Sequence, residues 1–195
     1  MDQCVSMGPR SIGLMEFNGQ HSFLHRLHCA QPLFFVVADL RAGKNTITIL
    51  RNLNECFPEP SSEAQENCWR AVSAIESGDA SALAAAMKDA QTLFVNCAVQ
   101  HCPSELLAPV LRRALQSEDV QRLALAGKGV GSQGDGSMQL LCASAEMQKQ
   151  VLELLQSPPF DFDAFALTIP ASGHIETPEH ILIGDCRCIA AEQIN

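Results

Sequence analysis

The sequence predicts an α+β fold in which helices pack on a mainly antiparallel sheet. Two observations support this prediction: a continuous apolar run typical of a buried strand, and several stretches whose apolar residues recur at helical spacing. With 195 residues and 47% hydrophobic content, the chain can bury a core as one domain, or as one domain plus a fragment of another.

Strands are expected first. Residues 11–27 indicate two short strands about Asn18-Gly19, because Asn-Gly supplies the positive φ angles of a tight hairpin turn. Residues 32–40, PLFFVVADL, are the continuous apolar run and predict a strand that is covered on both faces. Together these segments predict a small sheet.

Helices are expected next. Gly78-Asp79 separates two of them, and Ser104 is the expected N-cap of a later helix that Pro109 distorts or delays. The apolar faces predicted for the first three helices are Thr46, Ile49, Leu50, Leu53 and Phe57, then Cys68, Ala71, Val72 and Ile75, then Leu83, Met87, Ala90, Phe94 and Cys97.

The last third of the chain predicts strand, glycine loop, strand, helix and strand. The two strands that flank the loop are expected at residues 120–127 and 137–144, the helix at 145–156, and the final strand at 163–171. This order fits helices packed on an antiparallel sheet.

Charge and hydropathy exclude some classes of partner. The net charge is −9 and the 13 basic residues are scattered, which argues against a broad nucleic-acid surface. A window of about 18 apolar residues is absent, and the first residues lack the apolar core of a signal peptide. We therefore expect no nucleic acid, no membrane, and a cytoplasmic protein.

The nine cysteines form an odd set without any C-x-x-C pair, so we expect reduced, mostly buried thiols. The alternative is a metal site at residues 97–102, CAVQHC, or at residues 21–29, HSFLHRLHC. Neither segment repeats a zinc spacing with a second matching half, so no metal ligand is predicted.

The loop GKGVGSQGDGS, residues 127–137, holds five of the twelve glycines. Its G-x-G-x-x-G would bind a dinucleotide only if a helix followed, and a strand is expected there. The other protein-kinase signatures are absent. Two readings stay open: an anion site in which Lys128, Ser132 and Ser137 assist converging N–H groups, or a tight strand connection without a ligand.

Three segments resemble the GHMP kinases, the group of galactokinase, homoserine kinase, mevalonate kinase and phosphomevalonate kinase. Residues 123–142, LALAGKGVGSQGDGSMQLLC, resemble the third, glycine-rich motif of that family, and residues 102–115, CPSELLAPVLRRAL, resemble a helix that lies upstream of it. The opening Met1-Asp2-Gln3 resembles the galactokinase-like M-D-Q, which a hairpin and a strand follow.

The resemblance implies a ferredoxin-like C-terminal domain, an antiparallel sheet with helices packed on it, at residues 41–170. Residues 1–40 would be a remnant of the N-terminal kinase domain. Residues 171–195 form a tail of unassigned structure, which a nucleotidyltransferase domain would follow in some kinases of this kind.

The implied activity is phosphoryl transfer from Mg-ATP to a hydroxyl of a small molecule, and M-D-Q favours a sugar. Asp2 would orient or deprotonate the acceptor, and Gln3 would contact it. ATP and Mg²⁺ are the implied cofactors. The residues implied to surround the phosphates are Lys128, Gly129, Gly131, Ser132, Gly134, Gly136 and Ser137.

Two departures from the family pattern matter. The second motif, which wraps the ATP phosphates, lies upstream of M-D-Q, and this chain starts at M-D-Q. We therefore expect the C-terminal part of a kinase, inactive without its N-terminal half; a non-catalytic module with a phosphate-binding loop is the alternative. Asp135 is the second departure, a carboxylate within the loop that is left as either metal-side or structural.

Overall fold

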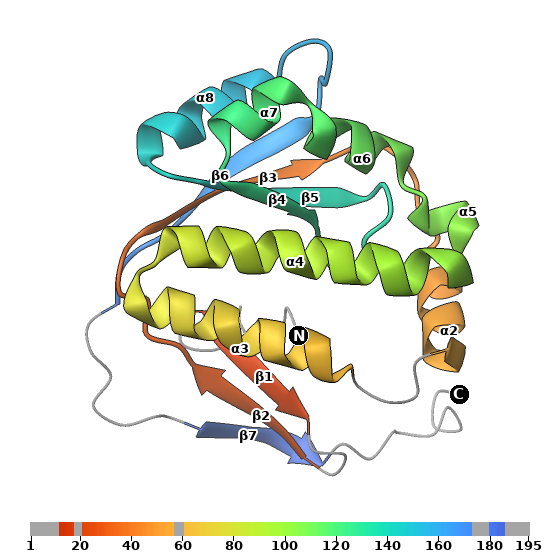
Figure 1. Cartoon of the computed structure of the whole chain (residues 1–195), viewed down its shortest axis with the longest axis vertical. Coiled ribbons are helices and arrows are strands. Elements are labelled where there is room, and N and C mark those ends of the chain that lie inside the picture. Colours follow the sequence, from red (N-terminus) through yellow and green to blue (C-terminus); the bar gives the residue numbers. More distant parts are fainter. Residues whose placement is uncertain (1–11, 18–20, 57–60, 173–179, 186–195) are drawn as a thin grey trace, which may run out of the picture.

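The computed structural model describes residues 12–17, 21–56, 61–172 and 180–185, and its strands form two antiparallel sheets (Figure 1). The larger sheet has the order β4-β5-β3-β6, and the smaller has the order β1-β2-β7. The strands are β1 (Gly13–Phe17), β2 (His21–Arg26), β3 (Leu33–Asp39), β4 (Ala126–Gly129), β5 (Ser137–Cys142), β6 (Asp163–Ile169) and β7 (His180–Asp185).

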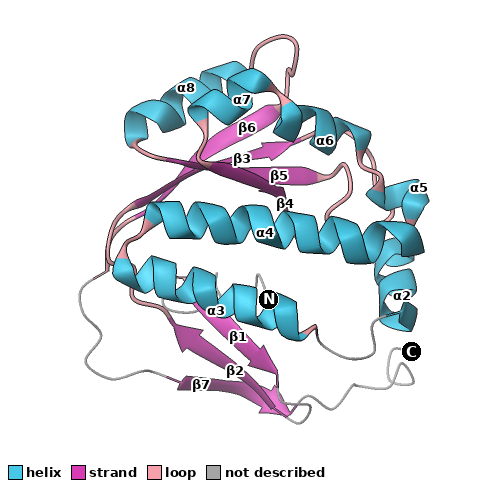
Figure 2. Cartoon of the chain, viewed as in Figure 1, coloured by secondary structure: helices cyan, strands magenta, loops and turns pink. Residues whose placement is uncertain are grey.

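The helices alternate with the sheets in layers (Figure 2). Helices α6, α7 and α8 cover one face of the large sheet, and α4 covers the other, with α3 between α4 and the small sheet. The helices are α2 (Thr46–Cys56), α3 (Ser62–Ser77), α4 (Ala80–Ala98), α5 (Pro103–Leu106), α6 (Pro109–Gln116), α7 (Glu118–Leu123) and α8 (Ala145–Leu155). No helix in the described ranges is long and apolar enough to cross a membrane.

Strand β3 is the centre of the large sheet, as its continuous apolar sequence predicts. Val36 pairs with Leu140 of β5 on one side and with Ala166 of β6 on the other, and its side chain is fully buried. β3 lies in the segment 1–40 that the predicted domain division separates from the rest; that division stays a prediction. The hairpin prediction is confirmed by β1 and β2, although Asn18 and Gly19 lie outside the described residues.

The predicted helices are confirmed, but the face that each buries differs in part. Gly78, at φ 73°, ends α3, and the Asp79 carboxylate accepts from the Ala82 N–H at 2.9 Å to begin α4. In α3 the buried side chains include Asn67, whereas Cys68 is exposed. Other exposed members of the predicted faces are Thr46, Leu50 and Cys97. Where the apolar stripe of a helix is wider than the surface that packs against it, the residues at the edges of the stripe stay exposed to solvent.

The prediction that Ser104 caps a helix is wrong. Cys102 is the N-cap of α5, Pro103 is its first residue, and the helix stops after Leu106. Pro109 then begins α6, preceded by Ala108 at φ 43°. Because proline fits the first turn of a helix but not its interior, Pro109 starts a new helix, as the predicted delay requires.

The strand predicted over residues 120–127 is also wrong at its start. Glu118–Leu123 forms helix α7, and β4 begins at Ala126. Glu118 and Asp119 lie in the first turn and Arg122 in the last, where each charge interacts favourably with the helix dipole. Val120 is buried in the core. Tertiary burial and these charges outweigh the short apolar run.

Candidate functional site: the glycine loop

The glycine loop, residues 130–136, joins β4 to β5 as an antiparallel connection. Gly129 pairs with Met138, after which the Val130 N–H donates to the Ser137 carbonyl at 3.0 Å. The Gln133 N–H donates to the Val130 carbonyl at 3.1 Å and closes a turn. Since a strand follows the loop, the dinucleotide-binding alternative is wrong.

Packing within the chain explains several of the glycines. A Cβ at Gly136 would lie 2.6 Å from Cε of Lys44, and one at Gly134 would lie 3.0 Å from the Glu105 carbonyl oxygen. Gly134 also has φ 70°, and Gly131 has φ 61° with open space around its Cβ position. The many glycines in the loop indicate that other atoms approach its backbone closely. At Gly134 and Gly136 those atoms belong to the chain itself, to the Lys44 side chain and the Glu105 backbone.

Close packing also explains the two glycines on β4. A Cβ at Gly127 would collide with Leu140, and one at Gly129 would lie 2.8 Å from Oε1 of Gln133. The Gly129 N–H donates to Oε1 of Gln91, on α4, at 2.8 Å. This bond ties the predicted phosphate-binding Gly129 to helix α4.

Lys128 is partly buried on β4, and its Nζ donates to the Gly129 carbonyl at 2.9 Å. Burial lowers the pKa of Lys128 because desolvation disfavours the ammonium. No carboxylate in the described part of the chain forms an ion pair with it. A partly buried cation held only by a carbonyl favours an anion nearby.

Lys44 is a second cation at the loop, and the sequence reading missed it. Its Nζ donates to the Gln133 carbonyl at 2.7 Å, and burial lowers its pKa. Lys44 also has no ion-pair partner among the described residues. No sequence signal could identify it, because its contact spans 89 positions.

Gln133 is the loop residue that the sequence reading also missed. It is buried, with φ 61°. Its carbonyl accepts from Lys44, its N–H donates to the Val130 carbonyl, and its amide oxygen lies beside Gly129 of β4. A glutamine in a glycine-rich segment is expected to be exposed to solvent. Its burial therefore depends on tertiary packing, which the sequence does not show. Gln133 is therefore the internal anchor of the loop.

Asp135 is structural. Its carboxylate accepts from the Val110 N–H at 3.2 Å and from the Leu111 N–H at 2.8 Å, at the start of α6. Pro109 occupies the first position of that helix, so the carboxylate satisfies the next two donors and faces the positive end of the helix dipole. Of the two readings left open for Asp135, the structural one accounts for both contacts.

Four of the predicted site residues remain: two serines of the loop region, and Asp2 and Gln3. Ser132 is half-buried in the turn, and Ser137 is the first residue of β5, opposite Asp39 of β3. In the described ranges, the N–H groups of Gly131 and Ser132 have no protein acceptor. Asp2 and Gln3 lie outside the described residues.

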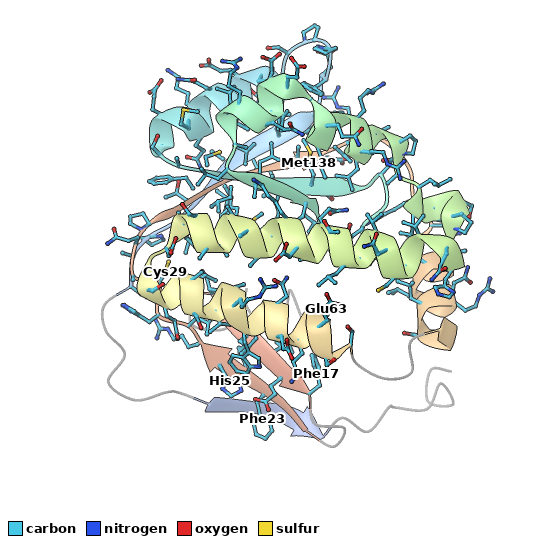
Figure 3. All side chains as sticks on the ribbon, in the orientation of Figure 1. Phe17, Phe23, His25, Cys29, Glu63 and Met138 are labelled. Carbon is cyan, nitrogen blue, oxygen red and sulfur yellow. The ribbon has the colours of Figure 1, made fainter. Side chains whose placement is uncertain are left out.

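The described residues contain no group of three or more His, Cys, Asp or Glu side chains that could hold a metal. In the segment 21–29, Nε2 of His25 lies 3.0 Å from the Glu16 carboxylate, whereas Cys29 is buried and donates to the Gln31 carbonyl. Figure 3 shows His25 and Cys29 at different places in the molecule. Cys97 is exposed and Cys102 is buried.

A cleft of about 400 Å³ opens beside the loop. Gln133 and Gly134 form part of its wall, and α4, α5 and α6 supply the rest, including Gln91 and Arg112. Its volume is within the range of small-molecule sites. The loop therefore borders a space large enough for a ligand group.

No protein-family model matches the sequence, and no curated protein matches it. Solved structures do match. The L. major mevalonate kinase in complex with R-mevalonate has a TM-score of 0.60 and 18% identity, over 79% of this chain and 50% of that one. The Streptococcus pneumoniae phosphomevalonate kinase has a TM-score of 0.61 and 13% identity, over 75% and 43%.

The same enzyme in complex with phosphomevalonate and AMPPNP has a TM-score of 0.57 and 17% identity, over 75% of this chain and 42% of that one. This chain therefore spans about half, or less, of these kinases. At such identities the likeness shows the fold, and the predicted α+β fold is confirmed.

Proposed function

We propose that this chain, which has the fold of the GHMP kinases, is the C-terminal part of an ATP-dependent kinase that phosphorylates a hydroxyl of a small molecule. One observation carries the proposal: the glycine loop joins β4 to β5 beside Lys128, a partly buried cation with which no carboxylate of the described residues forms an ion pair. In the proposed role, the N–H groups of Gly131 and Ser132 donate to a phosphate.

The residues of the loop suit a polyphosphate ligand better than a neutral one. The Lys128 ammonium donates to the carbonyl of Gly129, at the end of β4, and the Lys44 ammonium donates to that of Gln133 in the loop; burial lowers the pKa of both. A bound phosphate would compensate their charge. When bound, ATP supplies the phosphoryl group, and Mg²⁺ enters the proposal as the counter-ion of ATP, without an assigned ligand.

The acceptor is proposed to be a sugar hydroxyl, on the strength of the M-D-Q segment. Asp2 would orient or deprotonate the hydroxyl, and Gln3 would contact the substrate. Mevalonate and phosphomevalonate belong in the test, because they are bound in the similar structures. We also propose a cytoplasmic location, with the N-terminal half or a fused nucleotidyltransferase domain as partner and no nucleic acid or membrane.

The first test is the intact mass of the protein in its native source, compared with 21.1 kDa for this chain. A larger mass is expected. The native protein is then assayed for ATP-dependent phosphorylation of hexoses, mevalonate and phosphomevalonate. Turnover of a sugar supports the full proposal, turnover of mevalonate corrects the acceptor, and no turnover with any hydroxyl compound contradicts the kinase.

Substitution of Lys128 tests the role of the loop. Lys128→Gln removes the charge and is expected to lower kcat/KM about 100-fold, the usual effect of losing one donor to a transition-state charge. The matched control is Lys149→Gln, an exposed lysine of α8 whose weak pair with Glu153, at 3.9 Å, lies away from the loop. Equal activity of the two variants would remove Lys128 from the mechanism.

A second candidate, a non-catalytic module with a phosphate-binding loop, has its own support. The chain's own side chains account for the glycines at 127, 129 and 136, so the loop needs no ligand to explain them. Calorimetry with AMPPNP and Mg²⁺ separates the candidates. Binding without turnover in the native protein favours the module, and the absence of binding contradicts both.

A further inference from the structure

A second concave surface is lined by α5 and α6 and adjoins the cleft beside the glycine loop. This arginine groove has a volume of about 950 Å³, and it is lined by α5, α6, the residues that follow each helix, and Pro159-Phe160. Its volume is at the upper end of the range for small-molecule sites. Residues 130–136 do not line it, whereas Leu107, Arg112 and Gln116 line both this groove and the cleft beside the loop.

The charged side chains that line the groove are basic, although the chain is acidic. Arg112 and Arg113 both line it, and none of the described lining residues is acidic. The described residues offer neither guanidinium an ion pair, whereas Arg70 pairs with Asp89 and Arg122 pairs with Asp119. Two arginines at one groove, without an ion pair in the part of the chain that the structure describes, give the groove charge complementarity to an anion.

The framework of the groove is fixed by the core. Leu111 and Ala114 bury the inner face of α6, and the Asp135 carboxylate holds its first turn. Consecutive residues on a helix point about 100° apart, so Arg112 and Arg113 approach the groove from two directions. A ligand between them would contact two guanidinium groups whose helix is already positioned.

The wall of the groove is apolar. Leu107 is 51% exposed, and Phe160 packs on the main core with its ring 5.4 Å from that of Phe162. Prolines at positions 103, 109 and 159 extend this wall. The groove thus combines a site for a strong anion with a surface for a hydrocarbon body.

We propose that the arginine groove binds a soluble organic phosphate, with the phosphate between Arg112 and Arg113 and the apolar body against Leu107 and Phe160. Phosphate is the ligand of choice because guanidinium groups bind it with paired, charge-assisted hydrogen bonds. Ser104 and Gln116 add hydrogen-bonding groups at the rim. Because residues 130–136 do not line the groove, this binding does not depend on the kinase activity.

Calorimetry of the full chain with hexyl phosphate tests the proposal. Measurable binding is expected, and the double variant Arg112→Gln, Arg113→Gln is expected to weaken it about tenfold or more. Arg122→Gln, which removes an exposed helical arginine outside the groove, is the matched control and is expected to leave the affinity unchanged. Thermal unfolding confirms that the variants, all at exposed positions, stay folded.

Two further arms locate the ligand. Leu107→Ser is expected to weaken hexyl phosphate but not inorganic phosphate, since only the hexyl chain contacts the wall. Lys128→Gln is expected to change neither. The proposal is overturned if hexyl phosphate does not bind at millimolar concentration, if the double variant binds as tightly as the Arg122→Gln control, or if Lys128→Gln abolishes binding, which would place the phosphate at the glycine loop.

Discussion

At Gly136 the missing side chain makes room for Lys44, whose stem crosses the loop backbone before its ammonium reaches the Gln133 carbonyl. The atoms within 3 Å of the Cβ position all belong to this one flexible side chain. The contact joins the segment before α2 to the loop before β5. A glycine and a lysine far apart in sequence therefore form one packing unit.

This unit predicts coupling between the two positions. Gly136→Ala is expected to cost about 0.5–1.5 kcal/mol of unfolding free energy, because the added methyl group displaces the end of the Lys44 side chain and its hydrogen bond to the Gln133 carbonyl. In a Lys44→Ala background the same change is expected to cost much less. Urea unfolding of both single variants and the double variant measures the coupling, and additive effects would contradict the contact.

The lowered pKa of Lys128 predicts a pH dependence of stability. Since the folded state holds this proton less tightly, the unfolded state binds more protons between the lowered pKa and 10.5, and stability rises with pH across that window. The stability of the wild type relative to Lys128→Met is therefore expected to increase as the pH rises towards 10.5.

Urea unfolding of both proteins at several pH values measures this difference. The comparison cancels other groups, such as Cys142, whose pKa burial raises to about 11. A difference that is constant with pH would contradict the burial of the Lys128 ammonium. A difference that falls would reverse the sign of its pKa shift.

At the scale of elements, helix α6 connects the glycine loop to the arginine groove. Asp135 caps its first turn, Leu111 and Ala114 face the core, and Arg112 and Arg113 face outward. The sequence indicated a helix here that Pro109 delays, but it wrongly predicted Ser104 as the N-cap. It could not show that the capping carboxylate comes from a loop 24 positions downstream, since local caps are read only from the preceding residues.

The cap predicts that loop and helix loosen together. Asp135→Ala is expected to cost about 1–2 kcal/mol, as the loss of a charged cap does. Hydrogen exchange at residues 130–136 is expected to accelerate as well. Asp79→Ala, which removes the cap of α4, is the control: it is expected to destabilise the chain similarly without a selective change in the loop.

At the scale of the whole molecule, the large sheet carries the main core between two helical layers (Figure 2). On the face of the sheet that packs against α6, α7 and α8, side chains of the central strands such as Leu140 are fully buried. The edge strand β6 is less covered, since Leu167 is 42% exposed. Stability is therefore expected to depend on the central strands.

Leucine truncations test this distribution. Leu140→Ala is expected to cost about 2–5 kcal/mol, the range for a fully buried leucine. Leu167→Ala, the same change on β6, is expected to cost less than about 1 kcal/mol. Guanidinium unfolding compares the two, and equal losses would contradict the layering.

The sequence by itself determined the α+β class, the buried strand predicted at residues 32–40 and found at 33–39, and the strand, loop, strand, helix and strand order of the last third, because apolar periodicity and turn residues act locally. The tertiary structure alone decided that Lys44 and Gln133 fill the glycine loop, that Asp135 caps α6, and that residues 118–123 are helical. Those features depend on contacts between distant segments, whose free energy no local pattern contains.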